Sequence, residues 1–240
     1  MKVYLDNGST SFPKPKVVAD SIYNYLTNVG GNPGRSNHPK SLAANRVLYD
    51  TREKICNFFN FNKAENVIFT NNITSSLNIL LNGIIKPGDH VITSSMEHNS
   101  VLRPIYLAHE TIGCEYTVVR GDKTGMIDYA DLEKAIQPNT KMIAITHSSN
   151  VTGNIVDLEK VVAICKKHNL ISVVDASQTA GVYNIDLKEI SADMLAAPGH
   201  KGLLGPQGTG ILYIREGLNL NILKEGGTGS KSEDLFQPEI

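Results

Sequence analysis

The sequence has little excess charge of either sign, and this shortage already narrows the possible functions. Its 240 residues contain 23 Lys and Arg against 24 Asp and Glu, which gives a formal net charge of -1. No local run of basic residues stands out, so the electrostatic footprint of a nucleic-acid-binding protein is missing. The composition instead favours a protein that acts on small molecules.

Cysteines and long apolar runs are also scarce. Cys56, Cys114 and Cys165 lie far apart without a Cys-x-x-Cys pair, so neither a disulfide framework nor a zinc ribbon is supported. The N-terminus has no apolar signal core, and no stretch approaches the roughly 18 apolar residues of a membrane span. The seven histidines form no HExxH or similar cluster, so we expect no metal site. We therefore expect a cytoplasmic protein that does not contact a membrane.

The order of apolar runs predicts an α/β fold with a mainly parallel sheet. Short runs rich in β-branched residues occur at 67–70, 90–94, 115–119, 141–146, 170–175, 193–196 and 210–214. Segments of helical length lie between several of them, near 75–85, 101–112, 129–136 and 157–168. Such alternation is typical of a sheet covered by helices on both faces, a three-layer arrangement. We expect residues 61–240 to form this unit.

Residues 1–60 lead into the sheet. They begin as an extended arm that closes on Pro13 and Pro15, and a helix is expected at 16–28. Glycine, proline and asparagine exclude regular structure from the loop at 30–41. A long helix at 41–59 completes this section.

One lysine stands out in the stretch AAPGHKGLLGPQGTG, residues 196–210. Lys201 follows a Gly-His pair at a predicted strand end and precedes a glycine-rich turn. A partly desolvated amine beside a histidine that can carry charge stays neutral enough to attack an aldehyde and form a Schiff base. The alternative is an ordinary solvated lysine in a loop. The glycine spacing matches neither a Walker A loop nor a dinucleotide-binding fingerprint.

Asp175 ends another predicted strand, and its position needs an explanation. A carboxylate that ends an apolar run is buried at a cost unless it has a cationic partner. The protonated pyridine nitrogen of pyridoxal phosphate is such a partner, and its protonation makes the ring an electron sink. Because open α/β sheets bind ligands beyond the carboxyl ends of their strands, we expect Asp175 and Lys201 to flank one cavity.

Three further strand ends carry polar side chains with two possible interpretations each. Thr74 and Ser75 begin a helix, where hydroxyls and free N–H groups suit a phosphate or simply cap the helix. His98 could stack on a flat ring or move protons, or be a solvated loop histidine. The amide of Asn150 could bind a phenolate oxygen or a substrate carboxylate, or belong to a turn.

Together these residues resemble the class V, fold-type I pyridoxal-phosphate enzymes, specifically the cysteine desulfurase and selenocysteine lyase group. The matching stretches are LDNGSTSFPKP, GNPGRSNHPKS, FTNNITSSLN, SMEHNSV, HSSNVTG, VVDASQTAG and PGHKGLLGPQGTG. They follow the family's order and cover essentially the whole chain. The resemblance implies the large domain of a pyridoxal-phosphate-dependent transferase, with a mixed seven-stranded sheet.

The resemblance also implies a role for each site residue. Lys201 would carry the Schiff base and act with His98 in catalysis, while Asp175 would pair with the pyridine nitrogen. The other cofactor contacts would be His98 on the ring face, Gln178 and Asn150 at the phenolic oxygen, and Thr74, Ser75 and His200 at the phosphate. Arg35 and His38 would lie near the substrate, together with Asn150.

The implied reaction converts L-cysteine, or selenocysteine, to L-alanine and transfers the sulfur to an enzyme cysteine. A homodimer is implied, with residues 226–230 reaching the partner's cofactor, and a sulfur-acceptor protein is a further expected partner. Two departures matter. Pro198 occupies a position that is serine in many desulfurases, and the chain stops at Ile240 before the family's small domain with its substrate-binding arginine and catalytic cysteine.

From these departures we expect a truncated form that lacks the C-terminal small domain and is inactive alone. Two alternatives remain open at this stage. One is a different class V enzyme, an aminotransferase or β-lyase, for which the missing cysteine is irrelevant. The other is a non-catalytic module that binds the cofactor or a second polypeptide.

Overall fold

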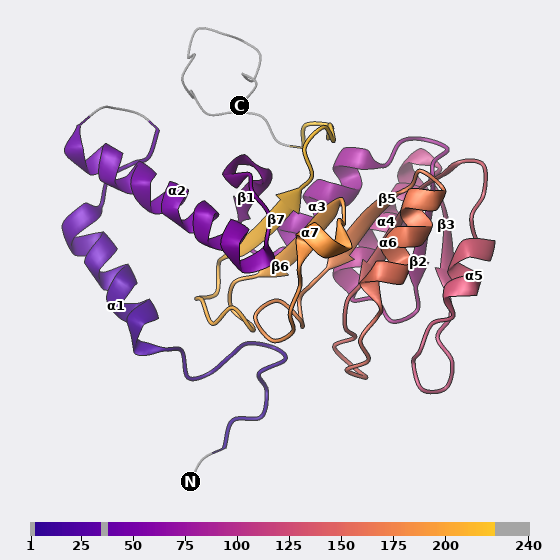
Figure 1. Ribbon diagram of the computed structural model, residues 1–240, viewed down its shortest axis with the longest axis horizontal. Helices are drawn as coiled ribbons and strands as arrows, with labels where there is room; N and C mark the ends of the chain where they lie inside the picture. The colour runs from indigo at the N-terminus through magenta and orange to yellow at the C-terminus, as the bar shows by residue number, and fades with distance from the viewer. Residues whose placement is uncertain (1–2, 35–37, 224–240) are drawn as a thin grey trace, which may run out of the picture.

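A seven-stranded mixed sheet forms the centre of the protein. The computed structural model describes residues 3–34 and 38–223 (Figure 1). The strands are β1 (Val67–Thr70), β2 (His90–Ser94), β3 (Glu115–Val119), β4 (Thr140–Thr146), β5 (Ile171–Asp175), β6 (Met194–Pro198) and β7 (Gly210–Ile214). Their order is β1-β7-β6-β5-β4-β2-β3, and only the pairs that include β7 are antiparallel. The predicted mainly parallel, mixed sheet is confirmed.

Most helices begin at a side chain that caps the first turn. The α-helices are α1 (Lys16–Asn24), α2 (Pro39–Phe59), α3 (Ile73–Ile84), α4 (Asn99–Ile112), α5 (Tyr129–Lys134), α6 (Leu158–Lys167) and α7 (Leu187–Ile190). Asn72, Asp128 and Asp157 accept backbone N–H bonds at the starts of α3, α5 and α6. No helix in the described ranges is long and apolar enough to cross a membrane.

Two helical features differ from the sequence-based expectation. The helix expected at 16–28 is α-helical only to Asn24 and continues as a π-helical turn, Tyr25–Val29. Helix α7 was not expected, because four residues are too few to show an apolar stripe. Its start is fixed by Asp186, whose carboxylate accepts the N–H groups of Lys188 and Glu189.

The core has two layers, one on each face of the sheet. Ile143 and Ile145 of β4 pack in the cluster that contains the buried residues of α5, α6 and α7. Met142 and Ala144, which alternate with them along the strand, pack with the buried residues of α3 and α4. Because successive side chains of a strand point to opposite faces, this division confirms the three-layer arrangement.

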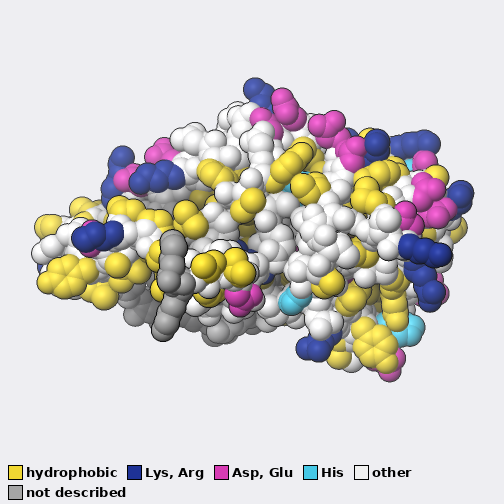
Figure 2. All heavy atoms as spheres, turned by 90° about the horizontal axis from the view of Figure 1, so that it is seen from below, with side chains coloured by type: hydrophobic (Ala, Val, Ile, Leu, Met, Phe, Trp, Pro, Cys, Tyr) yellow, Lys and Arg dark blue, Asp and Glu magenta, His cyan; other side chains and the backbone are white. Residues whose placement is uncertain are grey.

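Helices α1 and α2 extend beyond one end of the sheet. Helix α1 has no buried residue, and Val17, Ile22, Tyr23 and Leu26 at this end are all exposed. Figure 2 shows hydrophobic side chains gathered over this end of the molecule. Exposed apolar side chains in such a group are typical of an interaction surface.

A close approach between two glycines joins the segment after β5 to the loop after β6. Gly181 has φ +84°, and a Cβ there would overlap the backbone oxygen of Gly202. A Cβ on Gly202 would in turn overlap the backbone oxygen of Ala180. The missing side chains therefore let the loop with Lys201 lie against the segment that follows Asp175.

We expect Gly202→Ala to lower the free energy of unfolding by about 1–3 kcal/mol, because the added methyl group overlaps backbone atoms that cannot rotate away. Denaturant unfolding measures the change. Gly8→Ala is the matched control, since a Cβ there would lie 3.8 Å from the nearest atom, the side-chain oxygen of Gln178. Equal stability of the two variants would contradict the close approach.

Candidate active site

A cavity of about 420 Å³ opens at the carboxyl ends of the parallel strands. Seven residues selected from the sequence line it: Thr74, His98, Asn150, Asp175, Gln178, His200 and Lys201. The structure thus brings together side chains that follow β1, β2, β4, β5 and β6. Such convergence at the carboxyl edge is where open α/β sheets bind ligands.

Other candidates lie elsewhere. Ser75 lines a neighbouring cavity with Phe69 and Ile79, and its N–H donates to Asn72 Oδ1 at 2.8 Å. His38 begins α2, and its Nδ1 accepts the Ser41 N–H at 3.2 Å, so this ring does not line the cavity. Arg35 and residues 226–230 lie outside the described residues.

Asp175 is the most deeply buried charged group that faces the cavity. Its side chain ends β5 with 2% of the residue exposed, and Oδ1 accepts the Ser177 N–H at 2.8 Å. Burial raises the pKa of this carboxyl, while the Ser177 bond and the charges of Lys201 and His98 oppose the rise. Within the described residues no ion pair reaches Asp175. A cationic ligand N–H in the cavity would give it the partner that a buried carboxylate needs.

Lys201 lies three residues beyond β6 and is half-buried. Burial lowers the pKa of its ammonium group, and the carboxylate of Asp175 partly offsets this. Lowering the pKa increases the fraction of neutral amine, which is the form that attacks an aldehyde. The neighbouring imidazole of His200 has its pKa lowered by burial and then by the charges of Lys201 and Lys14.

Hydroxyl groups and a helix N-terminus line another side of the cavity. Thr74 in the first turn of α3 has its Oγ1 3.0 Å from Ser100 Oγ. Nδ1 of His98 accepts the Ser100 N–H at 3.1 Å, which leaves the proton of the neutral ring on Nε2. Free N–H groups and hydroxyls at the start of a helix suit a phosphate. The assignment of this side of the cavity to a phosphate stays a prediction.

The sequence reasoning missed several lining residues. Asp6, Gly8 and Ser9 of the N-terminal arm reach the cavity, and the Gln178 amide donates to the backbone oxygen of Gly8 at 3.2 Å. The arm has no regular structure, so no periodic pattern marks these contacts. Their only sequence signal is the cluster of turn-forming residues at 6–9.

Glu97, next to His98, is a second buried acid that was not selected. It is 9% exposed, and its Oε1 accepts the Ser94 hydroxyl at 2.6 Å. Burial raises the pKa of this carboxyl to about 8, and the negative charge of Asp175 adds to the rise. Glu97 is therefore largely protonated near neutral pH, so it adds little negative charge beside Asp175.

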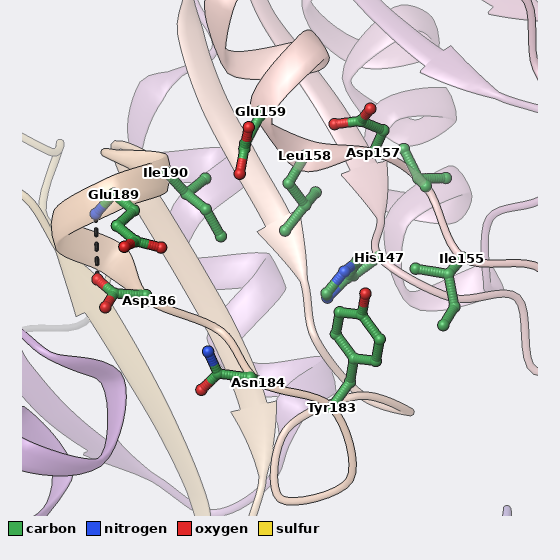
Figure 3. Close-up of a pocket in the computed structure, with 11 residues that line it drawn as sticks. His147, Ile155, Asp157, Leu158, Glu159, Tyr183, Asn184, Asp186, Glu189 and Ile190 are labelled. Carbon is green, nitrogen blue, oxygen red and sulfur yellow. Dashed lines mark hydrogen bonds between the residues drawn. The ribbon is translucent and has the colours of Figure 1, made fainter.

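A second cavity of about 480 Å³ lies behind β4 (Figure 3). Thr146 and Ser148 line the first cavity, whereas His147 between them lines the second, next to the ring of Tyr183. Its other polar residues include four carboxylates, those of Asp157, Glu159, Asp186 and Glu189. Burial lowers the pKa of His147 to about 4, so its ring is neutral. Its four carboxylates make this second cavity unfavourable for a phosphate dianion.

The fold is that of the large domain of a pyridoxal-phosphate-dependent transferase. The sequence matches the family described as aminotransferase class-V over residues 3–237, and the chain belongs to this family. The family uses pyridoxal phosphate as its cofactor.

Two curated relatives are similar to this chain over most of its length. A probable cysteine desulfurase of Methanothermobacter thermautotrophicus is 36% identical over 212 residues, which cover 88% of this chain and 52% of that protein. The cysteine desulfurase IscS of Buchnera aphidicola is 36% identical over 234 residues, which cover 94% of this chain and 57% of that protein. The chain thus spans about half the length of the curated relatives it matches.

Solved structures agree with this assignment. The apo structure of a cysteine desulfurase from Thermococcus onnurineus has a TM-score of 0.88 at 35% identity, covering 94% of this chain and 57% of that one. The structure titled SspA in complex with cysteine has a TM-score of 0.87 at 29% identity, covering 95% of this chain and 66% of that one.

The raised pKa of Glu97 predicts a pH-dependent stability. The folded protein holds this proton up to about pH 8, whereas an unfolded glutamate releases it near the usual 4.5. The stability that the proton provides is therefore present below about pH 4.5 and is lost as the pH rises towards 8. We expect Glu97→Gln to flatten the decline between those values by a few kcal/mol.

Unfolding midpoints measured across this pH range test the effect. Glu159→Gln is the matched control, because Glu159 is an exposed glutamate on α6. If Glu97→Gln follows the same pH profile as the wild type and Glu159→Gln, the assignment of a buried proton to Glu97 is wrong.

Proposed function

We propose that this chain is the cofactor-binding part of a cysteine desulfurase-type enzyme and that Lys201 binds pyridoxal phosphate covalently. One observation carries the proposal: an unpaired buried carboxylate and an amine with lowered pKa face the same cavity, opposite a helix start rich in hydroxyls. Among the described cavities, this one combines a nucleophile for the aldehyde with a counter-ion for the ring. The desulfurase relatives support the same assignment.

The cofactor, when bound, supplies an electron sink that allows a bond at the substrate Cα to break. Asp175 accepts the ring N–H and holds the proton there. The Lys201 amine would hold the cofactor covalently and would move the proton at the substrate Cα. His98 covers the ring face and excludes water from it.

The family resemblance gives the remaining contacts of the cofactor, and the lining of the cavity supports most of them. Thr74 and His200 would bind the phosphate. Ser75 keeps the phosphate role that the family resemblance gives it, although its N–H donates to Asn72 Oδ1. Gln178 and Asn150 donate to the phenolic oxygen. On the substrate side, Arg35 and His38 keep the role that the family resemblance gives them, although His38 caps α2.

In our proposal, the thiol that accepts the sulfur does not belong to Cys56, Cys114 or Cys165. All three cysteines are buried, and burial raises the pKa of Cys114 to about 11 and that of Cys165 to about 12. Burial also raises the pKa of Cys56. Because the thiolate is the nucleophile, none of them is suited to attack sulfur near neutral pH. The desulfurase reaction on cysteine or selenocysteine is therefore proposed for the whole protein, in the cytoplasm and with a sulfur-acceptor partner.

Because the three cysteines are buried, we keep a second candidate function. It is a class V reaction that needs no thiol, such as transamination or β-elimination. Incubation of the longest form of the protein with cysteine and other amino acids separates the reactions by their products. Alanine indicates desulfuration, and a keto acid indicates one of the alternatives. A chain that only binds the cofactor would give neither.

We also propose that the protein is a homodimer in which residues 61–240 form the cofactor domain and residues 1–60 lead into it. The exposed apolar side chains of α1 and α2 support an interface at that end of the molecule. Sedimentation of the purified chain measures the state directly, and a monomer at all concentrations would contradict this part of the proposal.

Covalent cofactor binding has a direct chemical readout. Borohydride reduces the C=N bond between lysine and pyridoxal phosphate to a stable amine, so mass spectrometry of peptides should find a pyridoxyl group on Lys201. Lys201→Ala should carry no adduct at any other lysine. A wild-type chain without adduct after exposure to excess cofactor would disprove the proposed role of Lys201.

The counter-ion role of Asp175 predicts a loss of affinity. We expect Asp175→Asn to weaken pyridoxal-phosphate binding at least about tenfold, equivalent to ~1.4 kcal/mol, because the ring N–H loses a charged acceptor. Equilibrium dialysis measures the change. Asp20→Asn, at an exposed residue of α1, should bind as the wild type does. Unchanged affinity in Asp175→Asn would contradict this role.

A further inference from the structure

The backbone oxygen of His200 is held by four donors from the N-terminal arm. The Ser11 N–H donates at 3.0 Å, and the hydroxyls of Thr10 and Ser11 donate at 3.1 Å each. The ammonium group of Lys14 donates at 2.6 Å. A carbonyl oxygen has two lone pairs, so this number of donors is unusual.

Lys14 makes the strongest of these contacts. Its Nζ also donates to Ser11 Oγ at 2.6 Å, so the hydroxyl that binds the carbonyl is itself oriented by the ammonium group. Hydrogen bonds from a charged donor are shorter and roughly twice as strong as neutral ones. Lys14 is half-buried, and this burial lowers the pKa of its ammonium group.

The oxygen held in this way belongs to the peptide bond that joins His200 to Lys201. On the other side of Lys201, its own carbonyl oxygen accepts the Leu204 N–H at 2.9 Å. Both peptide planes that flank the Lys201 Cα are therefore fixed, one by the arm and one by the loop itself. The position of this Cα determines where the side-chain amine enters the cavity.

The arm is itself anchored next to the cavity. The Asp6 backbone oxygen accepts the Ser9 N–H at 3.1 Å, and the Asp6 carboxylate accepts the Ser9 hydroxyl at 2.7 Å. The side-chain amide of Gln178 donates to the backbone oxygen of Gly8, which lies in the same turn. The arm thus contacts both Gln178, after β5, and His200, after β6.

We propose that Thr10, Ser11 and Lys14 form a carbonyl clamp that positions Lys201 for its reaction with the cofactor aldehyde. The inference rests on the proposed function, because it assigns these residues a role at the same site. In the reaction the Lys201 nitrogen forms a bond to the aldehyde carbon and the aldehyde oxygen leaves as water. The clamp holds the amine within the cavity before this bond forms, and a misplaced reactant costs rate steeply.

Lys14→Met removes the charged donor and leaves an unbranched side chain that is one heavy atom shorter. In the cofactor-free chain, competitive acetylation at a series of pH values, with peptides quantified by mass spectrometry, reports the pKa and reactivity of each lysine. We expect the pKa of Lys201 to rise towards that of a solvated lysine, since the released loop exposes its amine to water. We also expect the rate of covalent link formation with pyridoxal phosphate to fall about tenfold.

Two variants serve as controls. Lys16→Met removes a lysine from the same segment, but Lys16 is exposed and pairs with Asp20, so both readouts should match the wild type. Lys14→Arg keeps a charged donor and should restore most of the rate. If Lys14→Met does not fold, Thr10→Val removes one neutral donor and should shift both readouts in the same direction by a smaller amount.

The outcomes separate this inference from the proposed function. A wild-type chain that never binds the cofactor covalently disproves the function of Lys201, and the acetylation profile of the cofactor-free chain still tests the clamp. An acetylation profile of Lys201 that is the same in Lys14→Met, Lys16→Met and the wild type overturns the clamp, even if the cofactor binds. A changed profile in Lys14→Met that Lys14→Arg reverses supports it.

Discussion

The burial of Asp175 at the end of β5 is the constraint on which the rest of the site depends. A carboxylate with 2% of its residue exposed loses its hydration, and here the neighbouring protein groups only partly replace it. The parallel order of β4, β5 and β6 brings the side chains that follow these strands to the same edge. Lys201 is held close by the contact between Gly181 and Gly202. A ring that is cationic at its nitrogen and carries an aldehyde satisfies both groups at once.

Charge distinguishes the cavity at Lys201 from the one behind β4. They differ little in volume, but the one behind β4 has four carboxylates and a neutral histidine, whereas the one at Lys201 has two carboxylates, an ammonium group, hydroxyls and a helix start. Protonation of Glu97 removes a negative charge that would otherwise stand next to Asp175. The arm then closes the Lys201 cavity from a part of the chain almost 200 residues away in sequence, since its contacts to His200 span up to 190 residues.

Much of the fold was predictable because its signals are local. The alternation of β-branched runs and amphipathic segments located all seven strands to within two residues of their observed ends. Helix α7 was missed because it is too short for periodicity, and β6 was ended early at residue 196 although Pro198 pairs with Gly210 of β7. A proline usually marks the end of a strand. The sequence does not show that β7 lies beside Pro198 and pairs with it.

The site was predictable to the extent that it lies at strand ends. Thr74, His98, Asn150, Asp175 and Lys201 could be selected because each follows or ends an apolar run. Gln178 and His200 were added by the family resemblance, and all seven residues line one cavity. The contacts of Lys14 and the burial of Glu97 could not be selected, because they depend on packing between segments distant in sequence. Ser75 and His38 carry the right residue types, but their local geometry directs them to helix starts.

The central claim is that Asp175 and Lys201 hold opposite ends of one cofactor. A crystal structure of the chain grown with pyridoxal phosphate tests this most directly. The account predicts density continuous with Lys201 Nζ, a ring nitrogen within hydrogen-bond distance of an Asp175 carboxylate oxygen, and the phosphate at the start of α3. A cofactor bound in the cavity behind β4, or one in the Lys201 cavity with its ring nitrogen away from Asp175, would contradict it.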